Sequence, residues 1–254
     1  MKNMKLFFAA AFMLIISSAA VAQVTMSGQM KFSLANPGKQ YTLEVQPAHG
    51  SIKITGYSGN DVVINSITTG AAGMQNDETQ KSEVEGMRQY QSRGVQISGD
   101  GNKVIVKATN PTSTLNIDMM IPQNVLLKVS TLHGSVTIDN LSGEIEIISL
   151  GGNIDIKGIS GSVVINTSNS EVNVDFAAID AKMPTSFLST GGKINVSLPE
   201  TSKANIKILS TYGAIYSDFD IEFDASGKGK INGGGAEMSF ITLSGNIFLR
   251  KSKK

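Results

Sequence analysis

The sequence repeats a short motif, and this repetition restricts the fold more than any other feature. Each copy reads as a turn, a pair of aliphatic residues separated by one residue, and a second turn. Three close copies and three weaker ones occur at residues 49–59, 133–143, 151–161, 169–174, 191–196 and 212–216. One copy is too short to bury its own apolar side chains, so we expect successive copies to stack on one another.

The alternation within each copy is that of a β-strand with one buried face. Ile154 and Ile156, for example, flank Asp155. Four aliphatic pairs are predicted to point to the same side, namely Val136/Ile138, Ile154/Ile156, Val172/Val174 and Ile194/Val196. Stacking such strands about 4.8 Å apart would place like on like and build a continuous aliphatic core.

The spacing of the copies defines a structural unit. The second residue of each turn serves as a marker, and these markers are Gly134, Gly152, Ser170, Gly192 and Gly213, separated by 18, 18, 22 and 21 residues. A second strand halfway through the unit is predicted at residues 143–147 and 161–165. The sequence therefore predicts an all-β solenoid. The alternative is a β-sandwich, which also uses short strands at about nine-residue spacing but does not need residue-level repetition.

The N-terminal 22 residues have the three parts of a secretory signal peptide. Lys2 and Lys5 precede an apolar run at residues 6–16, and Ala20-Val21-Ala22 forms a small-x-small cleavage site. The run is shorter than the ~20 residues of a spanning helix, so no transmembrane segment is expected in the mature protein. The chain has no Cys, which excludes both a lipoprotein anchor and disulfides. We expect export to the periplasm, the outer surface or the medium.

The mature chain, residues 23–254, is predicted to be one β-solenoid domain. Its less regular first part contains expected strands at residues 41–45, 51–55, 62–67, 94–97, 103–107, 114–121 and 125–130. Residues 68–93 have too few apolar side chains for a core strand. We expect them to form a mobile insertion with a short helix at 78–91.

Four segments of the mature chain carry a family resemblance, at residues 43–45, 50–56, 61–64 and 119–130. They resemble the "putative adhesin" family of domains of unknown function, and the similarity covers roughly residues 40–249. The resemblance implies an extracytoplasmic, single-stranded, right-handed parallel β-helix and an adhesin-like role. It brings no catalytic residues with it.

Groups able to support catalysis or metal binding do not converge in the sequence. The two His residues, His49 and His133, occupy the same turn position, which indicates turn decoration rather than a metal site. Asp139, Lys157 and Asp175 fall at one position of successive units, which predicts a solvated ladder of opposite charges rather than a carboxylate site. We therefore expect no catalytic residues, no cofactor, no metal and no enzymatic activity.

The charge balance argues against nucleic acid as a partner. Removal of residues 1–22 takes away Lys2 and Lys5, so that 22 − 2 = 20 basic residues face 21 acidic ones. A nearly neutral protein lacks the basic surface that binding to nucleic acid requires. The expected partner is an envelope or extracellular glycan or protein.

Two further columns of side chains follow from the markers. The hydroxyls three residues before the markers are expected to pass hydrogen bonds from coil to coil, and they are Thr131, Ser149, Thr167, Ser189 and Ser210. His133, Asn169 and Tyr212 share a turn position and form the one candidate binding ridge, against the simpler alternative of random turn decoration.

The sequence thus favours an exported, non-enzymatic structural or interaction protein of the cell envelope. Two alternatives stay open. One is a carbohydrate-binding or polysaccharide-cleaving β-helix protein, and the other is an accessory component of envelope stress signalling.

Overall fold

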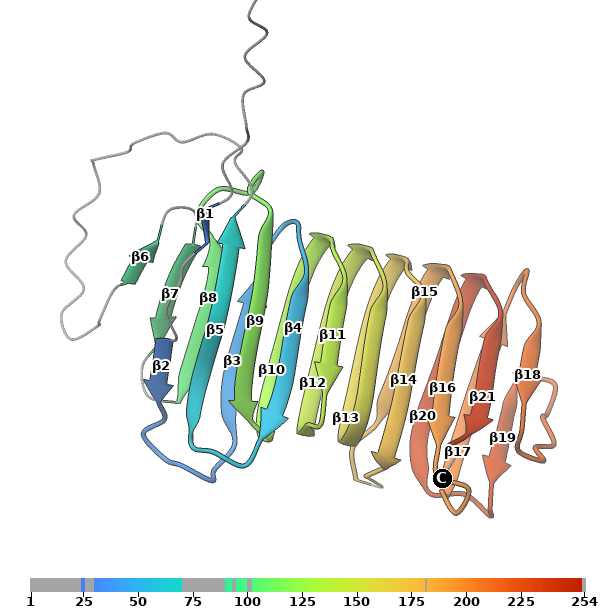
Figure 1. Cartoon of the computed structure of the whole chain (residues 1–254). Helices are drawn as coiled ribbons and strands as arrows, with labels where there is room; N and C mark the ends of the chain where they lie inside the picture. Colours follow the sequence, from blue (N-terminus) through green and yellow to red (C-terminus); the bar gives the residue numbers. More distant parts are fainter. Residues whose placement is uncertain are drawn as a thin grey trace, which may run out of the picture.

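The computed structural model describes residues 24–25, 30–69, 90–92, 95–99, 102–180 and 182–252. These residues form 21 strands of one sheet, which is mostly parallel and curls round on itself about a central core (Figure 1). The all-β class expected from the repeats is confirmed. The predicted signal peptide lies outside the described residues.

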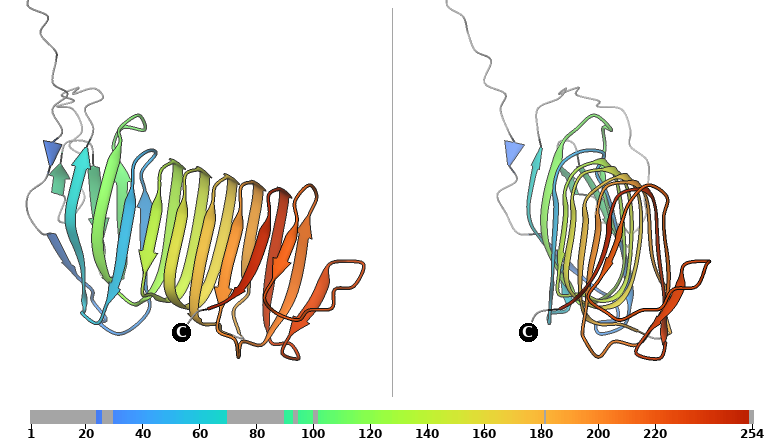
Figure 2. Two further views of the ribbon diagram at one scale, coloured as in Figure 1. Left: turned by 45° about the vertical axis from the view of Figure 1, so that its right-hand side comes forward. Right: turned by 90° about the vertical axis from the view of Figure 1, so that its right-hand side faces the viewer.

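The sheet has two long layers, which we call face A and face B (Figure 2). In spatial order, face A consists of β7 (Val95–Gly99), β8 (Lys103–Ala108), β3 (Tyr41–Gln46), β10 (Asn124–His133), β12 (Ser142–Gly151), the second half of β13 (Ile154–Asn169), β15 (Thr185–Gly191), β20 (Ala236–Ser244), β17 (Ala204–Ser210) and β19 (Lys228–Ile231).

Face B lies on the other side of the core. In spatial order it consists of β5 (Asp61–Thr69), β9 (Leu115–Pro122), β4 (Ile52–Tyr57), β11 (Val136–Asp139), the first half of β13, β14 (Val172–Ala178), β16 (Ile194–Leu198), β21 (Ile247–Lys251) and β18 (Ile215–Ser217). The chain of β13 crosses between the faces at Gly158, which has a φ of 67°.

Antiparallel pairs in the described residues lie only at the two ends of the stack. At one end, β1 (Val24–Thr25) and β2 (Met30–Ser33) pair with β5, and β6 (Tyr90–Ser92) pairs with β7. At the other end β19 covers β17. These strands form hydrogen bonds with backbone N–H and C=O groups that would otherwise be unpaired at the edges of the parallel stack.

The expected insertion at residues 68–93 is only partly described. Thr68 and Thr69 belong to β5, and residues 90–92 form β6, so the described residues of this segment are in strands. The last two residues of the helix expected at 78–91 are therefore in a strand as well. The remainder of both segments lies outside the described residues.

The inward alternation predicted for the repeats is confirmed. The four aliphatic pairs named above face the core and are at most 3% exposed. Val136, Ile154 and Val172 are direct neighbours on consecutive coils, as are Ile138 and Ile156. Like side chains therefore stack on like, and the core is one continuous cluster of aliphatic residues with a few aromatic ones.

The stacking order differs from the chain order at both ends. Among the described strands, β3 lies between β8 and β10, while β20 lies between β15 and β17. Face B repeats this arrangement with β4 and β21. The expectation that the copy at residues 191–196 stacks directly on the copy at 212–216 is therefore wrong, because the last coil of the chain is inserted between them.

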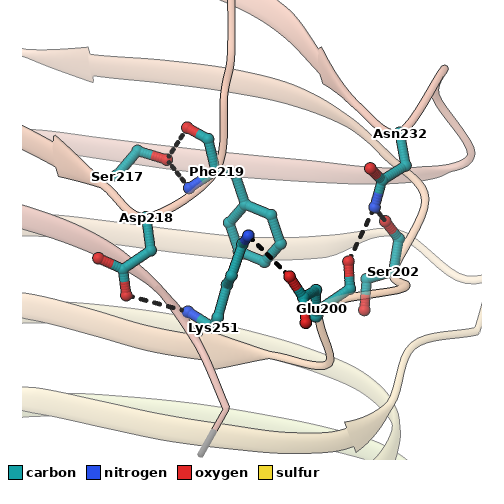
Figure 3. Close-up of polar contacts among 7 residues, drawn as sticks. All are labelled: Glu200, Ser202, Ser217, Asp218, Phe219, Asn232 and Lys251. Carbon is teal, nitrogen blue, oxygen red and sulfur yellow. Dashed lines mark hydrogen bonds and ion pairs between the residues drawn. The ribbon is translucent and has the colours of Figure 1, made fainter.

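A group of polar contacts holds the inserted C-terminal coil in place (Figure 3). Lys251 Nζ lies 2.9 Å from a carboxylate oxygen of Glu200 and 5.7 Å from the centre of the Phe219 ring. The Lys251 backbone N–H donates to Asp218 at 3.2 Å. Asn232 donates to the carbonyl oxygens of Glu200 and Ser202. Loops from three parts of the chain thus converge on the last strand.

The turn markers are mostly glycine because the coils approach closely there. A Cβ on Gly152 would lie 2.1 Å from the carbonyl oxygen of Gly134, and Gly152 also has a φ of 106°. Gly192 stands in the same relation to Ser170. Only a residue without a side chain fits such a position at normal van der Waals distances.

Candidate interaction surfaces

The residues of the predicted binding ridge share one turn column but do not touch. His133 lies beside Gly151, which lies beside Asn169. Gly191 and Ser244 separate Asn169 from Tyr212. At about 4.8 Å per coil, the three side chains lie about 10 and 14 Å apart. All three are exposed, Tyr212 by 79%. They are spaced too widely to hold one small ligand.

The two histidines are neighbours in space although they are far apart in the sequence. His49 and His133 form an isolated parallel bridge, and their rings stack with centres 5.8 Å apart. Within the described part of the chain, no group of three metal-binding side chains is present. The predicted common turn position of the histidines is therefore confirmed.

The charged column has the predicted register, but its members do not form ion pairs with one another. Asp139 lies beside Lys157, and Lys157 lies beside Asp175. No ion pair within 4.0 Å joins these three side chains in the described structure, whose five ion pairs involve other residues. Asp175 instead accepts a hydrogen bond from Ser252 at 2.9 Å. The predicted alignment of opposite charges is therefore confirmed, although no ion pair joins neighbouring members of the column.

The predicted hydroxyl column is present and contains one more member. Thr242 lies between Ser189 and Ser210, because β20 is inserted there. The hydroxyls do not bond to one another along the stack. Four of them donate to carbonyl oxygens, as in Ser149 to Gly151 and Ser210 to Gly245, both at 3.0 Å. Thr167 instead shares a hydrogen bond with the Ser170 hydroxyl, and the Thr242 hydroxyl has no partner. The column thus satisfies turn backbone groups, as expected, without a coil-to-coil chain of hydroxyls.

An amide column runs along face B and ends in two aromatic rings. Asn173 donates to Asp155 at 2.9 Å, Asn195 donates to Asn173 at 3.2 Å, and the Arg250 side chain donates to Asn195 at 2.8 Å. The next two members of the column are Phe248 and Tyr216, whose rings stack with centres 4.8 Å apart. Arg250 lies over the Phe248 ring at 5.1 Å.

Face A carries a row of solvent-exposed aliphatic side chains, which the sequence reasoning missed. Ile148, Leu188, Ile241 and Leu209 occupy one position along the strands, with Asn166 between the first two. At the next outward position are Leu132, Leu150 and Leu243. We call these seven residues the apolar stripe. All but the half-buried Ile241 are 41–49% exposed.

A signal for the apolar stripe was present in the sequence. Ile147-Ile148, Phe187-Leu188, Ile208-Leu209 and Phe240-Ile241 are each two consecutive apolar residues in an otherwise alternating strand. Because neighbours in a strand point to opposite faces, one member of each pair must face solvent. Contiguous apolar surface of this kind marks contact sites more often than a scattered exposed Leu does.

A row with several charged groups lies two residues before Ile148, Leu188, Ile241 and Leu209 in the same strands, at the adjacent outward position. This charged row runs Lys128, Glu146, Val164, Ser186, Ser239, Lys207 and Lys228. Lys128 and Glu146 form an ion pair at 3.0 Å. Lys207 and Lys228 instead face each other directly across an antiparallel pair, an arrangement that is destabilising for like charges.

A shallow hollow of about 220 Å³ lies on face A beside the apolar stripe. Glu44, Lys128, Glu146 and Ile148 contribute to its lining. The hollow therefore combines two carboxylates with one end of the stripe.

The described residues contain no helix that is long and apolar enough to cross a membrane. Their strands form a repetitive all-β protein whose distinctive surface features are the apolar stripe and the two polar columns of face B. The sequence profile of the Toastrack DUF4097 family matches residues 18–250. The chain therefore belongs to this family, and the resemblance found in the sequence is confirmed.

A crystal structure of a "putative cell adhesion protein" from Clostridium sporogenes is similar at 11% sequence identity with a TM-score of 0.41, and the match covers 89% of this chain and 99% of that chain. No curated protein matches the sequence.

Proposed function

We propose that this chain is an exported, non-enzymatic interaction protein of the cell envelope, built as a right-handed, single-stranded parallel β-helix. The parallel register of the repeats on both faces supports the architecture. The signal-peptide pattern of residues 1–22 supports export. In this proposal, the partner docks on the apolar stripe of face A.

The exposure of the stripe is the observation that carries the proposal. Ile148, Leu150 and Leu188 are each nearly half exposed, on a face whose other outward positions are mainly polar. Aliphatic side chains aligned over several strands favour the exclusion of water by another surface. They offer no group that could act as an acid, a base or a nucleophile, so the stripe suits binding rather than catalysis.

Photo-crosslinking in the native envelope tests this proposal. A photoreactive amino acid at Leu188 should yield a defined adduct after illumination, because the side chain would lie against the partner. The matched control carries the same group at Thr137, an outward position on face B, and should yield none. Absence of any adduct from Leu188, or equal labelling from both positions, would contradict the proposal.

The amide column favours glycan binding as a second candidate function. Asn195 and Arg250 present polar groups beside the stacked Phe248 and Tyr216 rings, and such a combination suits a sugar ring with its hydroxyls. Soluble envelope glycans should then bind the wild-type protein, and Tyr216→Ala should weaken the binding at least about tenfold. Equal binding by both proteins would eliminate this site.

A further inference from the structure

We infer that the partner on the apolar stripe is a second copy of this chain, packed face A to face A about a two-fold axis parallel to the strands. The inference rests on the proposed function, since it names the occupant of the same surface. It follows from how the rows of face A are ordered along the stack.

A two-fold axis parallel to the strands keeps each residue at its own position along the strand and reverses the order of the strands. With the axis over β15, Leu188 meets Leu188 of the second copy. The strand β12 then lies over β17 of that copy, which brings Ile148 onto its Leu209. Ile148, Leu188 and Leu209 thus pack against one another across the axis, as an isologous interface requires, while Ile241 meets Asn166 of the second copy.

The charged row contains one complementary pair under the same operation. Glu146 lies in β12 and Lys207 lies in β17, both one position from the stripe. The axis over β15 therefore places Glu146 opposite Lys207 of the second copy. This contact offsets the repulsion between Lys207 and Lys228, which no ion pair relieves within the described residues of one chain.

The two ends of face A also differ in net charge. Glu44, Glu144 and Glu146 are matched in number by Lys103, Lys107 and Lys128 at one end, which leaves no net charge there. At the other end Lys207, Lys228 and Lys230 outnumber Glu237, which leaves two excess positive charges. Antiparallel stacking of two copies places the cationic end of each copy over the neutral end of the other, and so keeps the two cationic ends apart.

The hollow beside Ile148 fits this arrangement. It lies over β3, β10 and β12, and the second copy's β19 would lie over β10, the middle strand of these three. The ammonium group of Lys228 from the second copy could then approach Glu44 and Glu146, which line the hollow. Lys228 of the second copy also comes to lie opposite Lys128, whose charge is partly compensated by its ion pair with Glu146.

The area of the surface is adequate for a dimer. The strands from β10 to β19 on face A span about 34 Å at ~4.8 Å each, and the outward rows span about 20 Å along the strands. Their product, about 700 Å², is close to the ~800 Å² per partner of a standard stable interface. Interfaces of standard size have dissociation constants from micromolar downward, so the dimer should form at micromolar concentrations or below.

Crosslinking of a single introduced cysteine tests the register. The chain has no Cys, so Leu188→Cys is its one thiol. Facing sheets pack about 10 Å apart, so a bismaleimide of about 8 Å span should join the two thiols across the axis. We expect a covalent dimer from Leu188→Cys and none from the control Thr137→Cys.

Sedimentation of charge variants tests the pairing. Lys207→Glu and Glu146→Lys should each raise the dimer dissociation constant at least about tenfold, and the double variant should return it to within about threefold of wild type. Thermal unfolding of each variant checks that the chain still folds. Restoration by the double variant is not expected from a merely structural role of either residue.

Two results would overturn the inference. The first is a wild-type protein that stays monomeric up to about 100 μM, a concentration well above a micromolar dissociation constant. The second is a dimer that Leu188→Glu leaves intact. If the wild-type protein is monomeric and Leu188 still crosslinks a different envelope protein, the proposed function stands while the inference about the second copy fails.

Discussion

Replacing Ile154 with alanine tests whether the repeats stack inward. The side chain is fully buried and lies between Val136 and Val172 of the neighbouring coils. Ile-to-Ala changes in cores cost about 2–5 kcal/mol. Backbone pairing fixes the coils on both sides, so the cavity cannot collapse freely, and we expect a loss in the upper part, about 3–5 kcal/mol. This loss lowers the folding equilibrium constant by about two to four orders of magnitude.

The matched control changes the adjacent residue. Asp155 points outward on the same strand and accepts a hydrogen bond from Asn173 at 2.9 Å. Asp155→Ser should therefore reduce stability by no more than about 1 kcal/mol. Urea unfolding followed by circular dichroism measures both variants. Similar losses at the two positions would refute the inward alternation, and a larger loss at Asp155 would indicate that its carboxylate is structurally essential.

Three further predictions concern the turns and the core. Gly152→Ala should destabilise the protein by several kcal/mol in thermal unfolding, because the new Cβ would meet a backbone oxygen at 2.1 Å. Gly38 has a similarly positive φ but no atom within 4 Å of the new Cβ, so Gly38→Ala should cost only about 1–2 kcal/mol. Thr242→Val should be neutral or stabilising, because the buried hydroxyl has no hydrogen-bond partner, while Ser149→Ala should cost about 1 kcal/mol. A Thr242→Val loss as large as that of Ser149→Ala would contradict this difference. Burial raises the pKa of the Tyr41 phenol, with a smaller contribution from Tyr57, so the folded state keeps it neutral. Above pH of about 10, where the unfolded chain ionises, stability should fall by about 1.4 kcal/mol per pH unit, and Tyr41→Phe should remove that part of the alkaline loss.

The strand pattern was readable from the sequence because it depends on local alternation. Each buried pair, such as Ile154 and Ile156, fixes which side of its strand faces the core regardless of what lies beyond it. The turn glycines marked the coil boundaries for the same reason, and the close copies at residues 133–143 and 151–161 are neighbours in space. Seven strands expected in the first part of the chain are present with boundaries shifted by at most three residues.

The order of the coils was not readable, because an aliphatic strand fits beside any other strand of the same pattern. The strands that carry Ser189 and Ser210 have the same alternating pattern whether they lie side by side or are separated by the strand that carries Thr242. The pattern therefore does not reveal that Thr242 lies between them. The covering strands β2 and β19 form because they pair with β5 and β17 at the two ends of the stack. Their short sequences therefore carried no signal of their own.

The candidate site was predicted only in part. His133, Asn169 and Tyr212 do share a column, but their separation along the stack depends on the inserted coil. The apolar stripe was missed because consecutive apolar pairs such as Phe187-Leu188 were interpreted only through the member that faces the core. Which outward positions line up across the face follows from the order of the strands.

Disulfide formation between introduced cysteines tests most directly the arrangement that creates the apolar stripe. Leu188 and Ile241 are direct neighbours on β15 and β20, so their Cα atoms should lie within the reach of a disulfide. Leu188 and Leu209 are separated by β20 and should lie about 10 Å apart. Under mild oxidation, the pair at 188 and 241 should crosslink efficiently and the pair at 188 and 209 should not. Crosslinking of 188 with 209 in preference to 241 would contradict both the inserted coil and the stripe.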